Sequence, residues 1–296
     1  MLSSGIWSTV IDDAAEHFYE AGISEPKVNA EYLALYILGV WNRTELQKFY
    51  DEPASEVQFR LYEQLVGRRL KREPLQHIVG ETEFFGLRLF TSPAALIPRS
   101  ETEILVEEGL KEAASLSKKN VRILDIGTGS GAIALALASR LPDASITGID
   151  ISHEAIMLAE QNKERVNSKN ISFEEIDIFS NGIENAFPHS IDLLISNPPY
   201  ISTEEFETLE PEVKLFDPRI ALTDESDGLI FYKRIAELAP SILTEEGRII
   251  VEIGYGAAQK VEQIFLDAGI AVLRIIKDLQ GIERVVTAKV LNGQHY

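Results

Sequence analysis

The run "LDIGTGSGAIALALA", Leu124 to Ala138, decides the fold of this 296-residue chain. An aliphatic stretch leads into three glycines at alternate positions, and an apolar stretch of helical length follows them. Glycine permits the sharp turn between a strand and a helix, and it lets a ligand approach the backbone at the start of that helix. The run therefore predicts a strand, a ligand-binding loop and a helix in immediate succession.

Strands and helices continue to alternate on the carboxyl side of this unit. Apolar runs typical of strands occupy residues 144–150, 171–177, 191–197 and 248–254, with helical patterns between several of them. Such alternation predicts a mostly parallel sheet with helices on both faces. Two final runs without a helix between them predict an antiparallel hairpin at the end of the chain. The fold class is therefore α/β, a Rossmann-like domain around a seven-stranded sheet.

The part that precedes this domain follows a different pattern. Apolar residues recur at helical spacing up to about residue 80, which predicts a small helical bundle as a first domain, residues 1–80. The run "TEFFGLRLFTS" has the period of strands around Gly86, so residues 81–98 are expected to form a β-hairpin linker. Residues 99–296 then form the α/β domain.

The start of the α/β domain carries a signal for a helix. Ser100 is followed three positions later by Glu103, and an apolar run comes next. This spacing is that of a capping box, in which the two side chains satisfy free amides of the first helical turn. A helix is therefore expected from about Glu101 to Ala114.

Charge and composition exclude several classes of function. Forty-seven acidic against twenty-eight basic residues give a net charge of −19, which disfavours a direct nucleic-acid partner. The densest basic cluster, "GRRLKRE" at residues 67–73, is expected to be the solvated face of a helix. The chain has no cysteine, and its five histidines are scattered, so we expect no disulfide and no metal site. It also shows no secretory signal and no membrane-spanning run, and we expect a cytoplasmic monomer without a membrane partner.

The glycine loop has acidic neighbours that bear on its ligand. Asp150 ends the next strand, where a carboxylate can bind both hydroxyls of a ribose. Asp125 precedes the loop, and the pattern D-x-G-x-G-x-G is usual in S-adenosylmethionine-dependent methyltransferases, where the acid can face the amino acid part of the cofactor. The glycines also satisfy the dinucleotide pattern, so NAD remains an alternative, although a carboxylate there opposes a pyrophosphate. Asp177 can accept from an adenine amino group, and Ile178 or Phe179 can lie on the ring.

A second motif, "SNPPYIS" at Ser196 to Ser202, ends the fourth strand of the predicted sheet. Ligands of open α/β sheets bind beyond the carboxyl ends of the strands, so Asn197 is expected beside the glycine loop. A planar NH2 group is a poor nucleophile because its lone pair is delocalised. The side-chain oxygen of Asn197 and the carbonyl of Pro198 can accept the two hydrogens of such an NH2 group. Pro199 keeps the Pro198 carbonyl rigid, and Tyr200 can stack on the planar group.

The chain resembles the bacterial release-factor glutamine methyltransferases over nearly its whole length. The resemblance rests on five blocks in order: "EPLQHIVGETEFFGLRL", "LIPRSETEILVE", "ILDIGTGSGAIALALA", "LLISNPPYI" and "DGLIFYKRI". It implies a class I methyltransferase domain behind a helical substrate-recognition domain. It also implies methyl transfer from S-adenosylmethionine to the glutamine of the Gly-Gly-Gln motif in peptide chain release factors, with S-adenosylhomocysteine as product.

The resemblance and the motifs together give the predicted site. The cofactor-binding residues are Asp125, Gly127, Thr128, Gly129, Ser130, Gly131, Asp150, Ile151, Asp177, Ile178 and Asn197. The catalytic residues are Asn197, Pro198, Pro199 and Tyr200, which also bind the substrate together with Phe84, Arg99, Glu101 and Thr102. Two positions depart from the family pattern: Ile178 stands where some relatives carry tryptophan, and Ser100 stands in place of the commoner proline.

Other activities share the same chemistry. A DNA adenine methyltransferase uses the same tetrapeptide but needs a recognition domain and a basic groove. A sister enzyme that methylates glutamine in a ribosomal protein is the nearest alternative, and the blocks around Arg99 and Phe84 favour the release factor. A cofactor-binding module without activity and a dehydrogenase are the alternatives from other classes.

Overall fold

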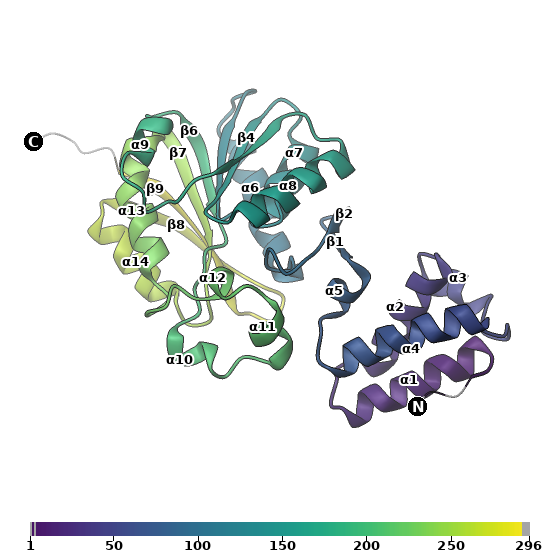
Figure 1. Cartoon of the computed structure of the whole chain (residues 1–296). Coiled ribbons are helices and arrows are strands. Elements are labelled where there is room, and N and C mark those ends of the chain that lie inside the picture. The colour runs from purple at the N-terminus through teal and green to yellow at the C-terminus, as the bar shows by residue number, and fades with distance from the viewer. Residues whose placement is uncertain (1, 3, 292–296) are drawn as a thin grey trace, which may run out of the picture. The chain divides into compact units, whose positions relative to one another are not determined.

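The structure is a computed structural model that describes residue 2 and residues 4–291, and it divides into two compact units (Figure 1). The first unit runs to Gly80 and includes Glu210–Phe216, and the second comprises Glu81–Leu209 and the chain from Asp217 onward. The hairpin segment, expected as a separate linker, is part of the second unit. The inclusion of Glu210–Phe216 in the first unit has no counterpart in the sequence prediction.

The first unit is helical, as predicted. Its core contains Trp7 and Tyr62, whose rings meet edge to face at 5.6 Å, and the buried Tyr62 hydroxyl donates to the carbonyl of Ala30 at 2.9 Å. Pro26 begins the second helix, where its missing N–H leaves no bond unmade. The helices are α1 (Trp7–Glu20), α2 (Pro26–Leu38), α3 (Arg43–Gln47), α4 (Glu56–Leu70), α5 (Leu75–Val79) and α11 (Pro211–Phe216).

The basic cluster at residues 67–73 is not the solvated face that its composition suggested. Arg69 is 5% exposed and donates to Asn29 Oδ1 at 2.8 Å and to Glu212 at 3.2 Å. Arg72 forms a second ion pair with Glu212 at 2.9 Å, and Arg68 forms one with Glu73 at 2.5 Å. These cations have acidic partners within the first unit because the tertiary fold brings α11 to the end of α4.

The second unit contains the predicted seven-stranded, mostly parallel sheet, in the order β5-β4-β3-β6-β7-β9-β8. The first and fourth strands of the sequence prediction, β3 and β6, are neighbours as expected. β9 is antiparallel to both β7 and β8, which confirms the final hairpin. The strands are β3 (Arg122–Ile126), β4 (Ser145–Asp150), β5 (Ile171–Glu175), β6 (Ile191–Ser196), β7 (Leu243–Glu252), β8 (Ile270–Lys277) and β9 (Glu283–Val290).

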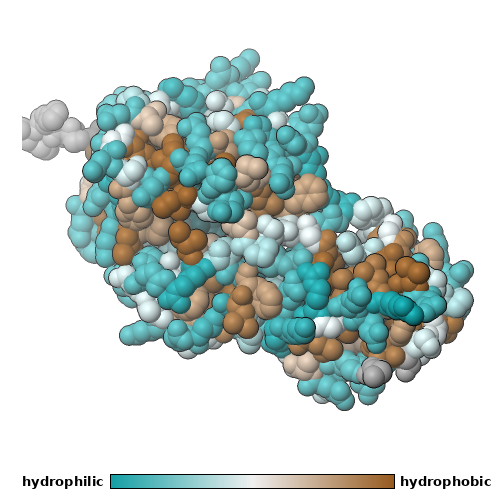
Figure 2. Space-filling view, viewed as in Figure 1, coloured by the Kyte–Doolittle hydropathy of each residue, from teal (hydrophilic) through white to brown (hydrophobic). Residues whose placement is uncertain are grey.

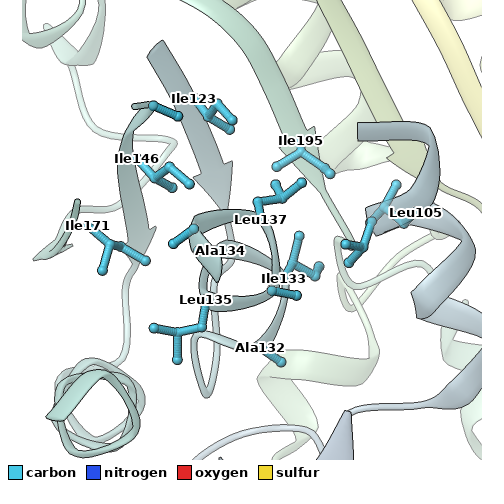
Figure 3. Close-up of a cluster of buried hydrophobic side chains, with 14 of the residues drawn as sticks. Leu105, Ile123, Ala132, Ile133, Ala134, Leu135, Leu137, Ile146, Ile171 and Ile195 are labelled. Carbon is cyan, nitrogen blue, oxygen red and sulfur yellow. The ribbon is translucent and has the colours of Figure 1, made fainter. Parts of the chain in front are cut away.

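Helices cover both faces of this sheet and enclose two apolar layers. Figure 3 shows the layer under α7, where Leu137 and Ala134 lie close to Ile123, Ile146 and Ile195 of the strands. One layer contains α6 (Glu103–Ser115), α7 (Ala132–Arg140) and α8 (His153–Val166), and the other contains α13 (Ile230–Ile242) and α14 (Ala258–Asp267). The shorter helices are η1 (Ser100–Thr102), α9 (Ile183–Ala186), α10 (Thr203–Phe206) and α12 (Arg219–Leu222).

The hairpin β1 (Glu81–Phe84) and β2 (Leu87–Phe90) turns at Phe85 and Gly86, both at positive φ. The predicted capping box after it is wrong. The 3-10 helix η1 occupies Ser100–Thr102, α6 begins only at Glu103, and the Ser100 hydroxyl donates to Glu101. The side chain of Glu103 instead accepts the N–H of Phe85 at 2.7 Å, so the acid joins the hairpin turn to α6.

Among the described residues, no helix is long and apolar enough to cross a membrane. Figure 2 shows hydrophilic residues interspersed with apolar ones over the visible face of the chain. Within residues 2 and 4–291 no group of three or more histidines, aspartates or glutamates is arranged to hold a metal ion.

Candidate active site

A cavity of about 680 Å³ opens in the second unit where several parallel strands end. The ends of β3 and β4, the segment after β5 and the segment after β6 form its floor and one side. Residues 94–99 and 218–225 line other parts of its wall. The cavity therefore lies where ligands of open α/β sheets bind, at the carboxyl ends of neighbouring strands.

The three glycines of the loop serve different purposes. All have positive φ, at 71° for Gly127, 55° for Gly129 and 79° for Gly131. A Cβ on Gly131 would lie 2.7 Å from the ring of Phe173, so this glycine is required by packing inside the unit. A Cβ on Gly127 would meet no protein atom within 4 Å, and Gly127 lines the cavity. That bare backbone surface suits close approach by a ligand.

Asp150 holds the glycine loop in place from the end of β4. One carboxylate oxygen accepts the N–H of Gly129 at 2.9 Å, and the other accepts the N–H of Ser152 at 3.0 Å. Burial raises the pKa of the carboxyl group, while these backbone donors oppose the rise. Asp150 also lines the cavity, as does the half-exposed Ile151 beside it. The roles predicted for both residues in cofactor binding remain predictions.

Asp125 does not reach the cavity, in contrast to the expectation that it faces the cofactor. It is completely buried on the sheet face that α7 covers, and its carboxylate accepts the hydroxyl of Thr128 at 2.6 Å. Burial raises the pKa of Asp125 to about 7, and the charge of Asp150 adds to this rise. The hydroxyl of Thr128 and the backbone amide of Ala134, in the first turn of α7, oppose the rise. Asp125 therefore supports the loop from beneath, while Thr128 and Ser130 line the cavity above it.

An aromatic pair lines the far part of the cavity, beyond β5. Phe179 and Phe231 meet edge to face with ring centroids 5.1 Å apart, and both line the cavity. Ile178 is buried beside them, and Asp177 accepts the N–H of Phe179 at 2.8 Å. Phe231 was not predicted; its only sequence signal is an aromatic residue in the first turn of a helix.

Asn197 lies beside the glycine loop, as the strand order predicts, and lines the cavity. Its Nδ2 donates to the hydroxyl of Thr102 at 3.2 Å, across 95 positions of sequence. The amide nitrogen is therefore engaged, and the amide oxygen is the end left to accept a donor. Pro198 and Pro199 are buried, and Pro199 also lines the cavity.

Tyr200 differs from the exposed aromatic wall that the tetrapeptide suggested. Its ring packs against Gly254, where a Cβ would lie 3.0 Å from Cδ2, and it does not line the cavity. Its hydroxyl donates to Oε1 of Glu252 at 3.3 Å, and burial raises the pKa of the phenol. The backbone carbonyl of Tyr200 is close to Gly228, since a Cβ on that glycine would lie only 2.2 Å from it.

The predicted substrate residues are only partly gathered. Phe84, Arg99 and Thr102 line the cavity, while Glu101 is exposed and does not. Arg99 donates to the buried carboxylate of Asp217 at 2.7 Å, and burial raises the pKa of that acid. Arg99 is thereby held at the rim by a residue that the sequence analysis did not single out.

The polar groups of the cavity discriminate between the two cofactors that the loop pattern allowed. The amides of Gly127 and Thr128 donate to the carbonyl of Ile149, and those of Gly129 and Gly131 are also engaged within the unit. A pyrophosphate therefore finds few free donors there, and it faces the carboxylates of Asp150 and Asp177. The two arginines of the lining, Arg99 and Arg219, are paired with Asp217 and Glu225. The acids near the loop therefore suit a cationic, zwitterionic ligand such as S-adenosylmethionine.

Comparisons with known proteins agree with this geometry. A family model described as a methyltransferase domain matches residues 117–267, and one described as the PrmC N-terminal domain matches residues 9–80. A release factor glutamine methyltransferase of Fusobacterium nucleatum subsp. nucleatum is 42% identical over 95% of this chain and 78% of its own. One from Geobacter sulfurreducens is 39% identical over 96% of this chain and 98% of its own.

A solved structure is also similar. It is titled a protein-(glutamine-N5) methyltransferase (release factor-specific) from Alicyclobacillus acidocaldarius subsp. acidocaldarius, and it is 31% identical to this chain. The match covers 67% of this chain and 96% of that one, with a TM-score of 0.40.

Proposed function

The chain belongs to the release factor glutamine methyltransferase family, and from this premise we propose that it methylates the glutamine of the Gly-Gly-Gln motif in peptide chain release factors. The methyl group would pass from the sulfonium of S-adenosylmethionine to the side-chain amide nitrogen, which then releases one proton to water, with S-adenosylhomocysteine as the second product. Because release factors act on ribosomes, the reaction takes place in the cytoplasm. The enzyme acts as a monomer and makes no direct contact with nucleic acid.

The observation that carries this proposal is the orientation of Asn197. Its nitrogen is engaged by Thr102, so its oxygen is available to accept one N–H of a substrate amide. The carbonyl of Pro198 is the second acceptor we assign, and the buried Pro-Pro step limits its movement. Two acceptors in fixed positions hold both hydrogens of the amide and leave the nitrogen lone pair directed at the methyl donor.

The residues around the loop would hold the cofactor. When bound, S-adenosylmethionine supplies an electrophilic methyl group on a sulfonium. We assign the ribose to Asp150 and the adenine to the apolar surface of Phe179 and Phe231, since all three residues line the cavity. Gly127 leaves room for close contact with the backbone. The chain's contribution to catalysis is the alignment of the amide with the methyl group, which accounts for large rate gains when reacting atoms are held about 3–3.5 Å apart.

The proposal is tested by incubating the protein with labelled S-adenosylmethionine and, in separate reactions, a release factor and a ribosomal protein preparation. We expect label on the Gly-Gly-Gln peptide and its loss in Asn197→Ala, with cofactor binding by calorimetry retained. Label on a ribosomal protein alone would instead identify the sister activity. Absence of label from the release factor, with a folded protein that binds the cofactor, would contradict the proposal.

A further inference from the structure

Asn162 is a fully buried residue of α8 that none of the motifs includes. Its side-chain oxygen accepts the N–H of Phe90 at 2.6 Å, and its side-chain nitrogen donates to the carbonyl of Phe90 at 3.1 Å. The same nitrogen donates to the carbonyl of Ser130 at 3.0 Å. Both hydrogens and the oxygen of the amide are therefore engaged, which fixes its orientation.

The two partners of Asn162 belong to segments that border different parts of the cavity. Ser130 lies within the glycine loop and lines the cavity. Phe90 ends β2, which pairs with β1, and the last residue of β1 is Phe84, another residue of the cavity lining. One side chain thus joins the glycine loop to the hairpin that carries Phe84.

Other residues of α8 contact the same two segments. A Cβ on Gly131 would lie 3.2 Å from the Cβ of Ala159, so the glycine loop packs directly on the helix. Arg165 forms an ion pair with Glu81 of β1 at 2.5 Å, and its guanidinium lies 4.1 Å from the centre of the Phe90 ring. The helix therefore supports the loop and the hairpin together.

We propose that Asn162 is a positioning residue that holds the glycine loop and the hairpin together, so that cofactor binding also orders the wall formed by Phe84. The inference rests on the proposed function, in which the loop holds the cofactor and Phe84 borders the substrate glutamine. A buried amide with all its bonds in use cannot turn without leaving polar groups unpaired, which is costly. A ligand that stabilises the loop therefore also stabilises the bonds between Asn162 and the hairpin.

Asn170 provides a matched control for the loss of hydrogen bonds as such. Its side-chain nitrogen donates to the carbonyls of Leu141 at 2.9 Å and Ala144 at 3.3 Å. These carbonyls precede β4, at the amino end of that strand, whereas the cavity lies at the carboxyl ends of the strands. Asn170→Ala therefore removes two bonds to backbone carbonyls without touching the loop or the hairpin.

The binding test measures the Kd for S-adenosylmethionine by calorimetry and the KM for a release factor by kinetics. We expect Asn162→Ala to raise both about 3- to 10-fold, the scale of one lost hydrogen bond. Arg165→Ala loosens the hairpin without touching the loop, so it should raise the KM and leave the Kd unchanged. Asn170→Ala should keep both within about twofold of the wild-type values.

Hydrogen exchange tests the link between the loop and the hairpin without a release factor. In the wild type, saturating S-adenosylhomocysteine should slow exchange over residues 81–90 about 5-fold or more, the scale of ordinary coupling between sites. In Asn162→Ala the ligand should protect the glycine loop but not the hairpin, and Asn170→Ala should behave as the wild type. Because these measurements need only the cofactor product, failure of the proposed function is distinguishable from failure of the inference.

Exchange in the wild-type hairpin that S-adenosylhomocysteine leaves unchanged would overturn the inference, and this measurement requires no variant. So would an Asn162→Ala variant with the same cofactor Kd as Asn170→Ala, or one whose hairpin the ligand still protects as in the wild type.

Discussion

Gly228 supports the active site through a contact that only glycine permits, and Gly228→Ala is the substitution that tests this. Gly228 has φ of 76°, and a Cβ there would lie 2.2 Å from the carbonyl oxygen of Tyr200 and 3.0 Å from its carbonyl carbon. Its N–H donates to Asp224 at 3.0 Å, so the glycine cannot move away without losing that bond. The added methyl group must therefore displace Tyr200, the last residue of the tetrapeptide.

The expected loss of stability in Gly228→Ala has two parts, and the matched variant Gly269→Ala separates them. An alanine at positive φ costs roughly 1–2 kcal/mol, and the overlap adds about 1–3 kcal/mol as in other overpacked sites. Gly269 has φ of 73° and no atom within 4 Å of its Cβ position, so Gly269→Ala carries the first cost alone. Relief of the contact requires a shift of about 1 Å next to the Pro-Pro step, and a displacement of that size lowers rates about 100-fold.

The assay measures the free energy of unfolding in urea, the Kd for S-adenosylmethionine, and kcat on a release factor for both alanine variants. We expect Gly228→Ala to be about 1–3 kcal/mol less stable than Gly269→Ala and about 100-fold slower, with cofactor affinity little changed. If Gly228→Ala matches Gly269→Ala in stability and in kcat, the contact with Tyr200 does not hold the tetrapeptide and the reasoning is refuted.

Three further substitutions test the cofactor site and the first unit. Asp150→Ala removes the acceptor of two backbone N–H groups and the proposed ribose contact. Because hydrogen bonds to charged groups contribute about 1.5–3 kcal/mol, we expect a loss of cofactor affinity of about 10- to 100-fold, measured by calorimetry. Phe231→Ala removes one ring of the aromatic pair and should weaken the affinity for S-adenosylmethionine about 3- to 10-fold. An unchanged Kd would show that Phe231 does not contribute to the cofactor site. Arg69→Ala removes a buried guanidinium that binds Asn29 and Glu212. Because Arg72 still pairs with Glu212, the loss of stability should be about 1–3 kcal/mol, whereas Arg60→Ala, which breaks an exposed ion pair, should change stability by less than about 1 kcal/mol in thermal unfolding.

The fold was predictable because its signals are local. A strand, a glycine turn and a helix occupy consecutive positions in "LDIGTGSGAIALALA", and several further strands contain short apolar runs, such as "LLI" in β6 and "IIV" in β7. The failures arose where distant segments compete for a side chain. Glu103 has the spacing of a cap but accepts an amide from Phe85, 18 positions earlier. Arg69 looks solvated in sequence but binds Glu212, 143 positions later.

The site was predictable only for residues that end a strand or form its following loop. Asp150 and Asn197 fall at such places, and the order of the parallel strands brings them to one cavity. Tyr200 shares the motif of Asn197 but turns its hydroxyl to Glu252, because β7 lies beside β6. No spacing of residues in the sequence predicts the contact between Tyr200 and Glu252. None predicts that Phe231 lines the cavity either.

The tetrapeptide Asn197–Tyr200 is held in position by segments that lie elsewhere in the chain. Pro-Pro limits the local backbone, but Asn197 is turned by Thr102 from η1, and the Tyr200 carbonyl abuts Gly228 just before α13. The Tyr200 ring lies against Gly254, the second residue beyond β7. A methyl transfer to a weak nucleophile depends on alignment, and alignment requires constraint from several directions. We therefore expect Gly228 and Gly254 to support the proposed site, because a side chain at either position would press on Tyr200.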